Sequence, residues 1–343
     1  MVFMASQLWA GLCSLVLIFG LGASIKAVAC DIREPIVFAG LNWDSNAFHT
    51  AVAQRILRDG MGCVVDQLPG ATIPLHNGMV KGDIHIIMEI WLANESKTWL
   101  DGVATGKVGS IGVNMADAVQ AWYVPRYLVE GPNAPAKGLR SVADLPRFKA
   151  LFADPEEPGK GRFYNCMAGW ACEPLNTKRL AGYGLSEHFT NVRPGSGGAL
   201  DAAIISALKR RKPILFYYWG PSWLLGQHAS ELIALEEPAF DPQAWAALMA
   251  ATDSAKVKVA TAFPVVDIVI GVNQAFIQKA PTIAKFLRNY RTSNRLVSEA
   301  LASMQTGKLS ADGAARLFLL NHPEVWEQWV TPDVVKRVRS SLG

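Results

Sequence analysis

Two nearby cysteines, Cys166 and Cys172, bracket Gly169 and Trp170, and a helical pattern starts directly behind them. A disulfide between the two cysteines would close a small ring and leave Trp170 facing outward. The amides of Ala171 and Cys172 would then point off a helix N-terminus, which attracts anions because its first N–H groups lack helical partners and the helix dipole adds positive charge. An indole face attracts cations. This turn therefore predicts a site for a small zwitterion.

The residues of this turn also fit roles without a ligand. A tryptophan beside a glycine is more often a packing residue than a ligand contact. The two cysteines are alternatively unpaired buried thiols, half of a metal site or a redox pair. Their spacing is not C-x-x-C, and no second pair of Cys or His lies at zinc spacing, which disfavours the metal and redox alternatives.

Composition limits the class of protein. The chain has 343 residues, of which 50% are hydrophobic and 18% charged. This is enough for a large core and matches the size of two lobes or two domains. The formal net charge of +4 is small and its charges are scattered, whereas nucleic-acid-binding proteins carry a concentrated basic surface. We therefore expect no nucleic-acid partner.

The first 29 residues are typical of an export signal, although their n-region lacks Lys and Arg. Leu8 to Leu21 is an uncharged apolar run too short to span a bilayer comfortably, and Ala27-Val28-Ala29 fits a cleavage site of small residues. We predict that residues 1–29 are a signal peptide and that the protein is periplasmic. Cleavage there would leave Cys30 first, as in a lipoprotein, but Ala27 stands where lipoprotein signals carry leucine. A soluble periplasmic protein is therefore favoured over a lipoprotein, and an uncleaved anchor comes third.

Four cysteines remain after the signal, and an even number in an exported chain predicts two disulfides. Cys166–Cys172 is the favoured pair. Cys30 and Cys63 stand just ahead of the first two strand-like segments, so they would lie side by side at one edge of a parallel sheet and form the other. That disulfide would keep Cys30 from carrying a lipid.

The N-terminal part alternates strand and helix patterns. An amphipathic helix that closes at Gly60 and a short helix at 74–81 separate strands predicted at 36–40, 63–68 and 84–90. This order and these lengths favour a parallel, doubly wound sheet. Ligands of such sheets collect beyond the carboxyl ends of the strands. Trp43 and Trp91 lie at such ends.

The middle of the chain predicts a second lobe with two crossings back to the first. Strand-like segments at 108–113 and 121–125 lead out of the first lobe, and 257–262 is predicted as a return strand. A buried strand at 214–218 ends at Trp219, so a tryptophan again follows a strand. We expect one lobe from residues 30–118 and 258–343 and the other from 119–257, joined by a hinge.

Three segments give the chain a resemblance to a known family. They are Gly82-Asp83-Ile84-His85-Ile86-Ile87-Met88-Glu89-Ile90-Trp91, the turn Cys166-x3-Trp170-x-Cys172-Glu173, and Pro213-Ile214-Leu215-Phe216-Tyr217-Tyr218-Trp219-x-Pro221-x-Trp223. In this order and spacing they are similar to the substrate-binding proteins of ABC importers for glycine betaine, proline betaine and choline. The resemblance covers essentially the whole chain after residue 29.

The resemblance implies an α/β fold of the two-lobed periplasmic-binding-protein type (type II), with a mixed, mostly parallel sheet in each lobe. It implies a box of Trp91, Trp170 and Trp219 around a quaternary ammonium group, with the amides of Ala171 and Cys172 on the ligand carboxylate. Trp43 is a candidate fourth wall. Indole faces suit a trimethylammonium group, which has no N–H to donate. The implied partner is an ABC permease in the membrane, and we expect the receptor to be a monomer.

One position departs from the family pattern. Several relatives carry a histidine four residues after the first tryptophan of the box, where it helps to bind the carboxylate, and here Glu95 occupies that offset. An ionised Glu95 would repel a carboxylate and attract a cation. Either Asn94 or another donor takes the role of the histidine, or the ligand is less anionic, such as choline or trimethylamine N-oxide. Alternatively, Glu95 simply faces solvent.

An enzyme is the main alternative class, and a sensing protein that is not coupled to transport is the third. The histidines show no metal spacing, and the chain has neither a Gly-x-Ser-x-Gly elbow nor a phosphate-binding loop. We expect a receptor that binds its ligand without changing it, with no catalytic residues, no cofactor and no metal.

Overall fold

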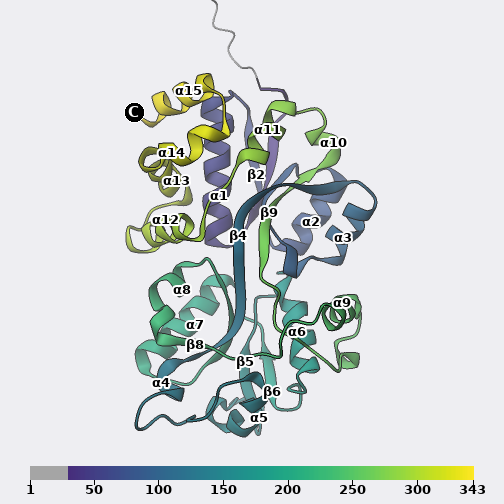
Figure 1. Cartoon of the computed structure of the whole chain (residues 1–343), viewed down its shortest axis with the longest axis vertical. Helices are drawn as coiled ribbons and strands as arrows, with labels where there is room; N and C mark the ends of the chain where they lie inside the picture. The colour runs from purple at the N-terminus through teal and green to yellow at the C-terminus, as the bar shows by residue number, and fades with distance from the viewer. Residues whose placement is uncertain (1–29) are drawn as a thin grey trace, which may run out of the picture.

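The computed structural model describes residues 30–343, which form two lobes stacked along the long axis of the molecule (Figure 1). The predicted signal peptide lies outside the described residues. Each lobe has a β-sheet flanked by helices, so the predicted two-lobed α/β fold is confirmed. Lobe I, at the top of Figure 1, combines the N-terminal strands with the C-terminal helices, and the middle of the chain forms lobe II below it.

The sheet of lobe I has the strand order β2-β1-β3-β9-β4. Its strands are β1 (Ile36–Leu41), β2 (Val65–Gly70), β3 (Ile86–Trp91), β9 (Val266–Asn273) and the first part of β4 (Val108–Pro125). β1 is parallel to β2 and β3, whereas β9 runs antiparallel to β3 and β4. β1 and β3 are buried almost throughout, which suits their runs of aliphatic residues in a sheet covered on both faces.

Helices from both ends of the chain pack around this sheet. Phe48 of α1 meets Phe318 of α13 edge to face, with ring centroids 5.5 Å apart. Trp326 and Trp329 are buried in the same core. The helices of lobe I are α1 (Asp44–Arg55), α2 (Thr72–Lys81), α3 (Lys97–Ala104), α10 (Gln274–Ile277), α11 (Pro281–Asn289), α12 (Asn294–Thr306), α13 (Ala311–Asn321), α14 (Pro323–Trp326) and α15 (Pro332–Leu342).

The sheet of lobe II continues from the second part of β4. There β4 pairs antiparallel with β7 (Leu215–Gly220) and β8 (Leu232–Ala234), and β5 (Gly161–Tyr164) lies parallel to β7 and β6 (Phe189–Val192). β7 is buried along its whole length. The helices of lobe II are α4 (Arg126–Val129), α5 (Leu145–Phe148), α6 (Cys172–Gly182), α7 (Gly197–Arg210), α8 (Trp223–His228) and α9 (Pro242–Ala250).

The first crossing between the lobes is β4 itself. It pairs with β9 of lobe I from Val108 to Ala118 and with β7 of lobe II from Val119 onward. One continuous strand therefore replaces the two separate strands expected at 108–113 and 121–125. Asp117, at the changeover, has a φ of 57°, a left-handed conformation that Asp tolerates better than most residues.

The second crossing, residues 257–265, has no regular secondary structure, so the predicted return strand at 257–262 is wrong. Some of its backbone groups form hydrogen bonds with side chains of lobe II and with a loop, and not with a neighbouring strand. Thr261 O accepts from the Arg179 guanidinium at 3.1 Å and from the Tyr183 hydroxyl at 2.9 Å. Ala262 N–H donates to Pro238 O at 2.8 Å. These backbone groups therefore have hydrogen-bond partners without a neighbouring strand.

Both predicted disulfides are present. Cys30–Cys63 joins the segments that lead into β1 and β2, with Cα atoms 5.0 Å apart. Cys166–Cys172 closes the turn before α6, with Cα atoms 6.2 Å apart. Cys30 therefore has no free thiol to carry a lipid.

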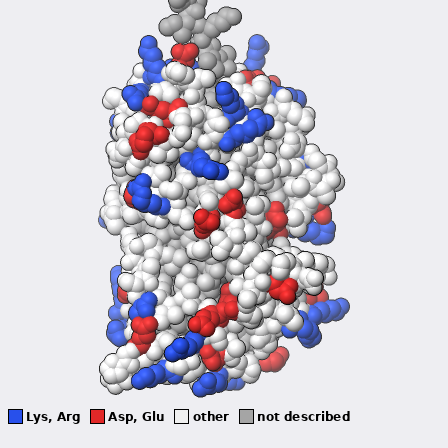
Figure 2. All heavy atoms as spheres, viewed as in Figure 1, with Lys and Arg blue, Asp and Glu red and all other residues white. Residues whose placement is uncertain are grey.

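Positive and negative side chains are interspersed over the face of the molecule shown in Figure 2. This face has no extended basic surface of the kind that binds nucleic acid. Within residues 30–343, no helix is long and apolar enough to cross a membrane.

Candidate ligand-binding site

A cavity lies between the two lobes, at the carboxyl ends of β1, β3 and β7. All four tryptophans proposed from the sequence line it, as do both residues whose amides were proposed to bind an anion. Lobe I contributes Trp43, Thr72, His76, Glu89, Trp91 and Asn94, and lobe II contributes Trp170, Ala171, Cys172, Tyr217 and Trp219.

The two tryptophans of lobe I share one hydrogen-bond acceptor. Oε2 of Glu89, in β3, accepts from Trp43 Nε1 at 2.8 Å and from Trp91 Nε1 at 3.0 Å. Trp91 ends the same strand, and Trp43 follows the neighbouring strand β1. One buried carboxylate thus fixes the orientation of both indole rings.

The Glu89 side chain is fully buried, and no Lys or Arg of the described residues pairs with it. Its nearest basic group is His49, with Nε2 4.0 Å from Oε1. Burial lowers the pKa of His49 to about 3, so this imidazole is neutral at pH 7. Burial raises the pKa of Glu89, and the two indole hydrogen bonds oppose that rise. A cation in the cavity would favour the ionised carboxylate.

Aromatic neighbours hold the two tryptophans of lobe II. Trp170 meets Trp43 and Trp219 edge to face, with ring centroids 5.4 and 5.3 Å apart. Trp219, near the end of β7, stacks on Tyr218 with centroids 4.4 Å apart. Because the indoles meet at steep angles, they form adjoining walls of a box and not a stack. Such a box surrounds a compact cation well.

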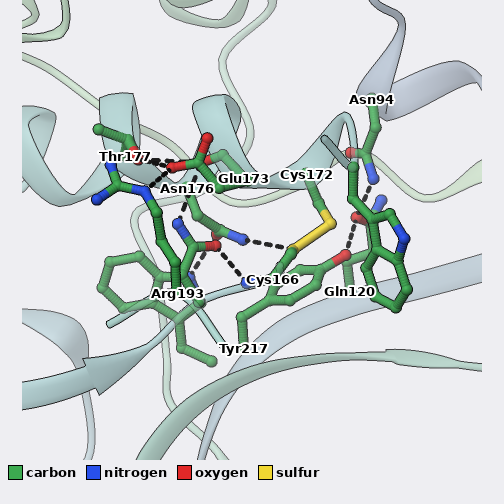
Figure 3. The surroundings of a disulfide bond; sticks show 12 residues. Asn94, Gln120, Cys166, Cys172, Glu173, Asn176, Thr177, Arg193 and Tyr217 are labelled. Carbon is green, nitrogen blue, oxygen red and sulfur yellow. Dashed lines mark hydrogen bonds and ion pairs between the residues drawn. A yellow bond between two sulfur atoms is a disulfide. The ribbon is translucent and has the colours of Figure 1, made fainter. Parts of the chain in front are cut away.

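The turn that carries Trp170 is fixed from several sides (Figure 3). The Cys166–Cys172 disulfide closes it, and Asn165 Oδ1 accepts from the Cys166 N–H at 2.7 Å. Gly169 has a φ of 93°, a conformation that residues with a Cβ rarely adopt. The geometry expected from the sequence, a closed turn that presents Trp170 to the site, is therefore present.

Two backbone donors lie beside this tryptophan. α6 begins at Cys172, with Ala171 as its N-cap. Within residues 30–343 the N–H groups of Ala171 and Cys172 have no acceptor, whereas the next N–H, of Glu173, donates to Trp170 O at 3.2 Å. These free donors lie at the positive end of the helix dipole, which suits an anionic or partly negative oxygen.

The lobes touch directly at the edge of the cavity. Trp170 Nε1 of lobe II donates to Asn42 Oδ1 of lobe I at 2.6 Å, and Ile73 N–H donates to Gly169 O at 3.1 Å. A Cβ at Gly169 would lie 3.0 Å from Ala71 Cβ, so glycine also permits this close approach.

Asn94, the proposed replacement for the histidine, and Glu95, which occupies the position of the histidine, point in different directions. Asn94 lines the cavity and donates through Nδ2 to Gln120 Oε1 at 2.6 Å, an oxygen that also accepts from Tyr217 OH at 2.6 Å (Figure 3). Its own Oδ1 has no partner among the described residues. Glu95 is not among the lining residues, because its carboxylate turns toward α3 and accepts from Trp99 Nε1 at 3.1 Å.

Sequence reasoning missed several lining residues. Glu89 had a usable signal, since an acidic residue inside an apolar strand is rarely buried without a role. Tyr217 was recognised only as part of a buried strand. Thr72 and His76 lie on α2, away from every tryptophan motif, and only the packing of α2 against the Gly169 turn brings them to the cavity.

Comparisons with known proteins agree with this geometry. The profile of the family described as the substrate-binding domain of ABC-type glycine betaine transport systems matches residues 34–321. The glycine betaine/proline betaine-binding periplasmic protein of Salmonella typhimurium is 24% identical over 91% of this chain and 90% of its own length. The protein of the same name from Escherichia coli is 26% identical over 60% of this chain and 62% of its own, so that match spans less than two thirds of the relative.

Among solved structures, an ABC-transporter choline-binding protein in complex with choline superposes with a TM-score of 0.71 at 18% sequence identity. The superposition covers 92% of this chain and 99% of the choline-binding protein. At this identity the likeness concerns the fold alone. The family profile, in contrast, extends over most of the described residues and over both lobes. The chain therefore belongs to the family of substrate-binding domains of ABC-type glycine betaine transport systems.

Proposed function

We propose that this protein is a periplasmic solute receptor that binds a small quaternary ammonium compound of the glycine betaine type and delivers it to an ABC import permease. One observation carries the proposal: four tryptophans from both lobes surround a cavity that also contains two free amide N–H groups, those of Ala171 and Cys172. The indoles suit the trimethylammonium head, and the amides suit the carboxylate. The names of the relatives support the same ligand class.

The magnitudes fit such a ligand. Each contact between an indole face and a cation contributes about 0.5–2 kcal/mol, and each hydrogen bond to a charged group about 1.5–3 kcal/mol. Several of both, less the loss of ligand freedom on binding, are consistent with affinity in the micromolar range, about −8 kcal/mol. Because the box is divided between the lobes, only the closed protein offers all of these contacts, and ligand would favour closure.

The test is a calorimetric titration of residues 30–343 with glycine betaine, choline and trimethylamine N-oxide in parallel. We expect glycine betaine to bind most tightly, because it matches both the box and the amides. Tighter binding of choline or the N-oxide would support the proposed role as a receptor but assign it a different ligand. Absence of heat with all three compounds would refute the proposed ligand class.

Choline is the second candidate, and the Glu89 carboxylate favours it. The Glu89 carboxyl group holds two walls of the box, and in its ionised form, which a bound cation favours, it attracts any methylammonium head, including one without a carboxylate of its own. The same titration decides between the two ligands.

The proposal includes binding without chemical change and action as a monomer. Proton NMR of glycine betaine recovered after prolonged incubation with the protein should show the starting compound only. Light scattering should give the mass of a single chain with and without ligand. A new product would indicate an enzyme, and a ligand-dependent dimer would indicate a different mode of delivery.

A further inference from the structure

One side of the cavity is formed by α2, which the tryptophan motifs do not include. Thr72 and His76 lie four residues apart on this helix, so they share one face, and both line the cavity. The first turn of α2 is held against the opposite lobe, because Ile73 N–H donates to Gly169 O at 3.1 Å. The helix that carries His76 is thus in contact with the turn that bears the free amides of Ala171 and Cys172, and all three residues line the same cavity.

His76 is almost fully buried, with 2% of its surface exposed. Its Nδ1 lies 2.7 Å from Ser96 Oγ, and its Nε2 has no hydrogen-bond partner among the described residues. An unpartnered buried nitrogen is unfavourable in an empty protein. In a residue that lines a binding cavity, it indicates a place for a ligand atom.

The neighbours of His76 favour one of the two neutral tautomers of its ring. Ser96 is the N-cap of α3, and its Oγ accepts from Trp99 N–H at 3.2 Å. The Ser96 hydroxyl hydrogen has no acceptor other than His76 Nδ1 among the described residues, so the tautomer that satisfies this hydrogen has the proton of the neutral ring on Nε2. Burial lowers the pKa of His76 to about 4, so the ring is neutral at pH 7. In this tautomer the unpartnered Nε2 is an N–H donor.

We infer that His76 is a specificity-determining residue whose Nε2–H donates to an oxygen of the bound ligand, opposite the amides of Ala171 and Cys172. The inference rests on the proposed function, since it names the group that receives the non-ammonium end of the ligand. The oxygen site is then built from both lobes: an imidazole from lobe I and two backbone amides from lobe II.

This arrangement has a consequence for selectivity. All three donors are electrically neutral, so they favour an oxygen with negative or partly negative charge without adding a full positive charge beside the ammonium box. A ligand that has the quaternary ammonium group but no oxygen gains nothing from His76. The contribution of His76 is therefore measured by comparing two ligands that differ in this end alone.

The experiment titrates four proteins with glycine betaine and with tetramethylammonium, which has the cationic head and no oxygen. They are the wild type, His76→Phe, His76→Gln and the control His85→Gln. Gln restores an amide donor near the position of Nε2, and Phe keeps a ring without one. His85 is in the same lobe, stacks on Phe276 with centroids 4.6 Å apart, and does not line the cavity. Thermal melts of all four verify folding.

His76→Phe should weaken glycine betaine binding roughly 10- to 100-fold and change tetramethylammonium binding little. His76→Gln should recover most of the loss, and His85→Gln should behave as the wild type. Unchanged betaine affinity in His76→Phe, or equal loss of both ligands, would overturn the inference while the proposed function stands. A wild type that binds neither ligand would instead refute the proposed function, and the inference with it.

A second measurement does not depend on ligand. Nitrogen-15 NMR of the histidine rings at pH 7 should show His76 as the neutral tautomer with the proton on Nε2. A proton on Nδ1 would make Nε2 an acceptor and would contradict the inference whatever the variants show.

Discussion

The two lobes hold their halves of the aromatic box by different physical means. In lobe I, Trp43 and Trp91 are oriented by hydrogen bonds to one buried carboxylate, Glu89. In lobe II, Trp170 lies on a turn closed by a disulfide, and Trp219 is held by stacking on Tyr218. The half of the box in lobe I therefore depends on an ionisable group, and the half in lobe II depends on a covalent bond and on ring packing. The two halves should respond to different perturbations.

The largest effect should come from Trp170→Ala. This change removes the indole that meets both Trp43 and Trp219, and also the hydrogen bond to Asn42 across the lobes. Glycine betaine binding should fall at least about 100-fold, since several kcal/mol of contacts are lost. Calorimetry measures the loss, and circular dichroism should show an intact fold. Trp245→Phe, in a tryptophan of lobe II that does not line the cavity, is the control. Near-normal affinity in Trp170→Ala would refute the box.

The next effect should come from Glu89→Gln, which keeps the shape of the side chain and removes its charge. Both indoles donate to the same oxygen of Glu89, so the amide oxygen of Gln can still accept from both and the substitution removes mainly the charge. We expect roughly a 10- to 100-fold weaker affinity for tetramethylammonium. Glu95→Gln is the matched control, because the Glu95 carboxylate binds Trp99 outside the cavity. Equal effects of the two substitutions would mean that Glu89 acts only through general stability.

The dependence of binding on pH should be set by lobe I. Burial raises the pKa of Glu89 above its ordinary value of 4.5, and a bound cation favours its ionised form. Affinity for tetramethylammonium, which has no titrating group, should be constant above the pKa of Glu89 in the free protein. Below it, affinity should fall by up to about tenfold per pH unit. The Glu89→Gln variant should show a flat profile. A wild-type profile that is equally flat would show that the Glu89 charge does not contribute.

The smallest effect on affinity should come from removing a disulfide. The two disulfides should differ in whether their loss affects ligand affinity or mainly the stability of the fold. Replacing Cys166 and Cys172 by Ser should weaken betaine binding several-fold, because the turn that presents Trp170 gains freedom. The same change at Cys30 and Cys63 should leave affinity unchanged and lower stability more, since it opens a loop of 33 residues and not 6. The loop-entropy relation gives about 4 and 2 kcal/mol respectively. Denaturant titration with calorimetry distinguishes the two pairs, and the reverse pattern would contradict this assignment.

The stability of the protein in acid should reflect two buried histidines. Burial lowers the pKa of His49 to about 3 and that of His76 to about 4, whereas the unfolded chain binds these protons near pH 6.5. The stabilisation is therefore complete above pH 6.5 and is lost as the pH falls toward these values. Each histidine contributes a slope of up to about 1.4 kcal/mol per pH unit. Denaturant unfolding at several pH values should show a shallower slope in His76→Gln. An unchanged slope would mean that His76 is protonated without opening the fold.

The parts of this molecule that were predictable from the sequence are the locally encoded ones. The turn around Trp170, the tryptophans that follow strands, and the pairing of Cys30 with Cys63 all depend on short spacings or strand order. The orientation of Glu95 was not predictable, because Trp99 competes for its carboxylate after α3 has packed. The contribution of His76 was hidden for a similar reason: only the contact between the two lobes brings α2 to the cavity. The return strand failed because Arg179, distant in sequence, bonds that backbone.

The continuity of β4 has a thermodynamic consequence. The same strand supplies hydrogen bonds to β9 in one lobe and to β7 in the other. If either sheet melts, β4 is freed from half of its partners, and the remaining sheet is left with an unsupported edge. The two lobes should therefore unfold together, with one heat-absorption peak whose calorimetric and van't Hoff enthalpies agree. A protein built of two lobes is in this respect a single cooperative unit.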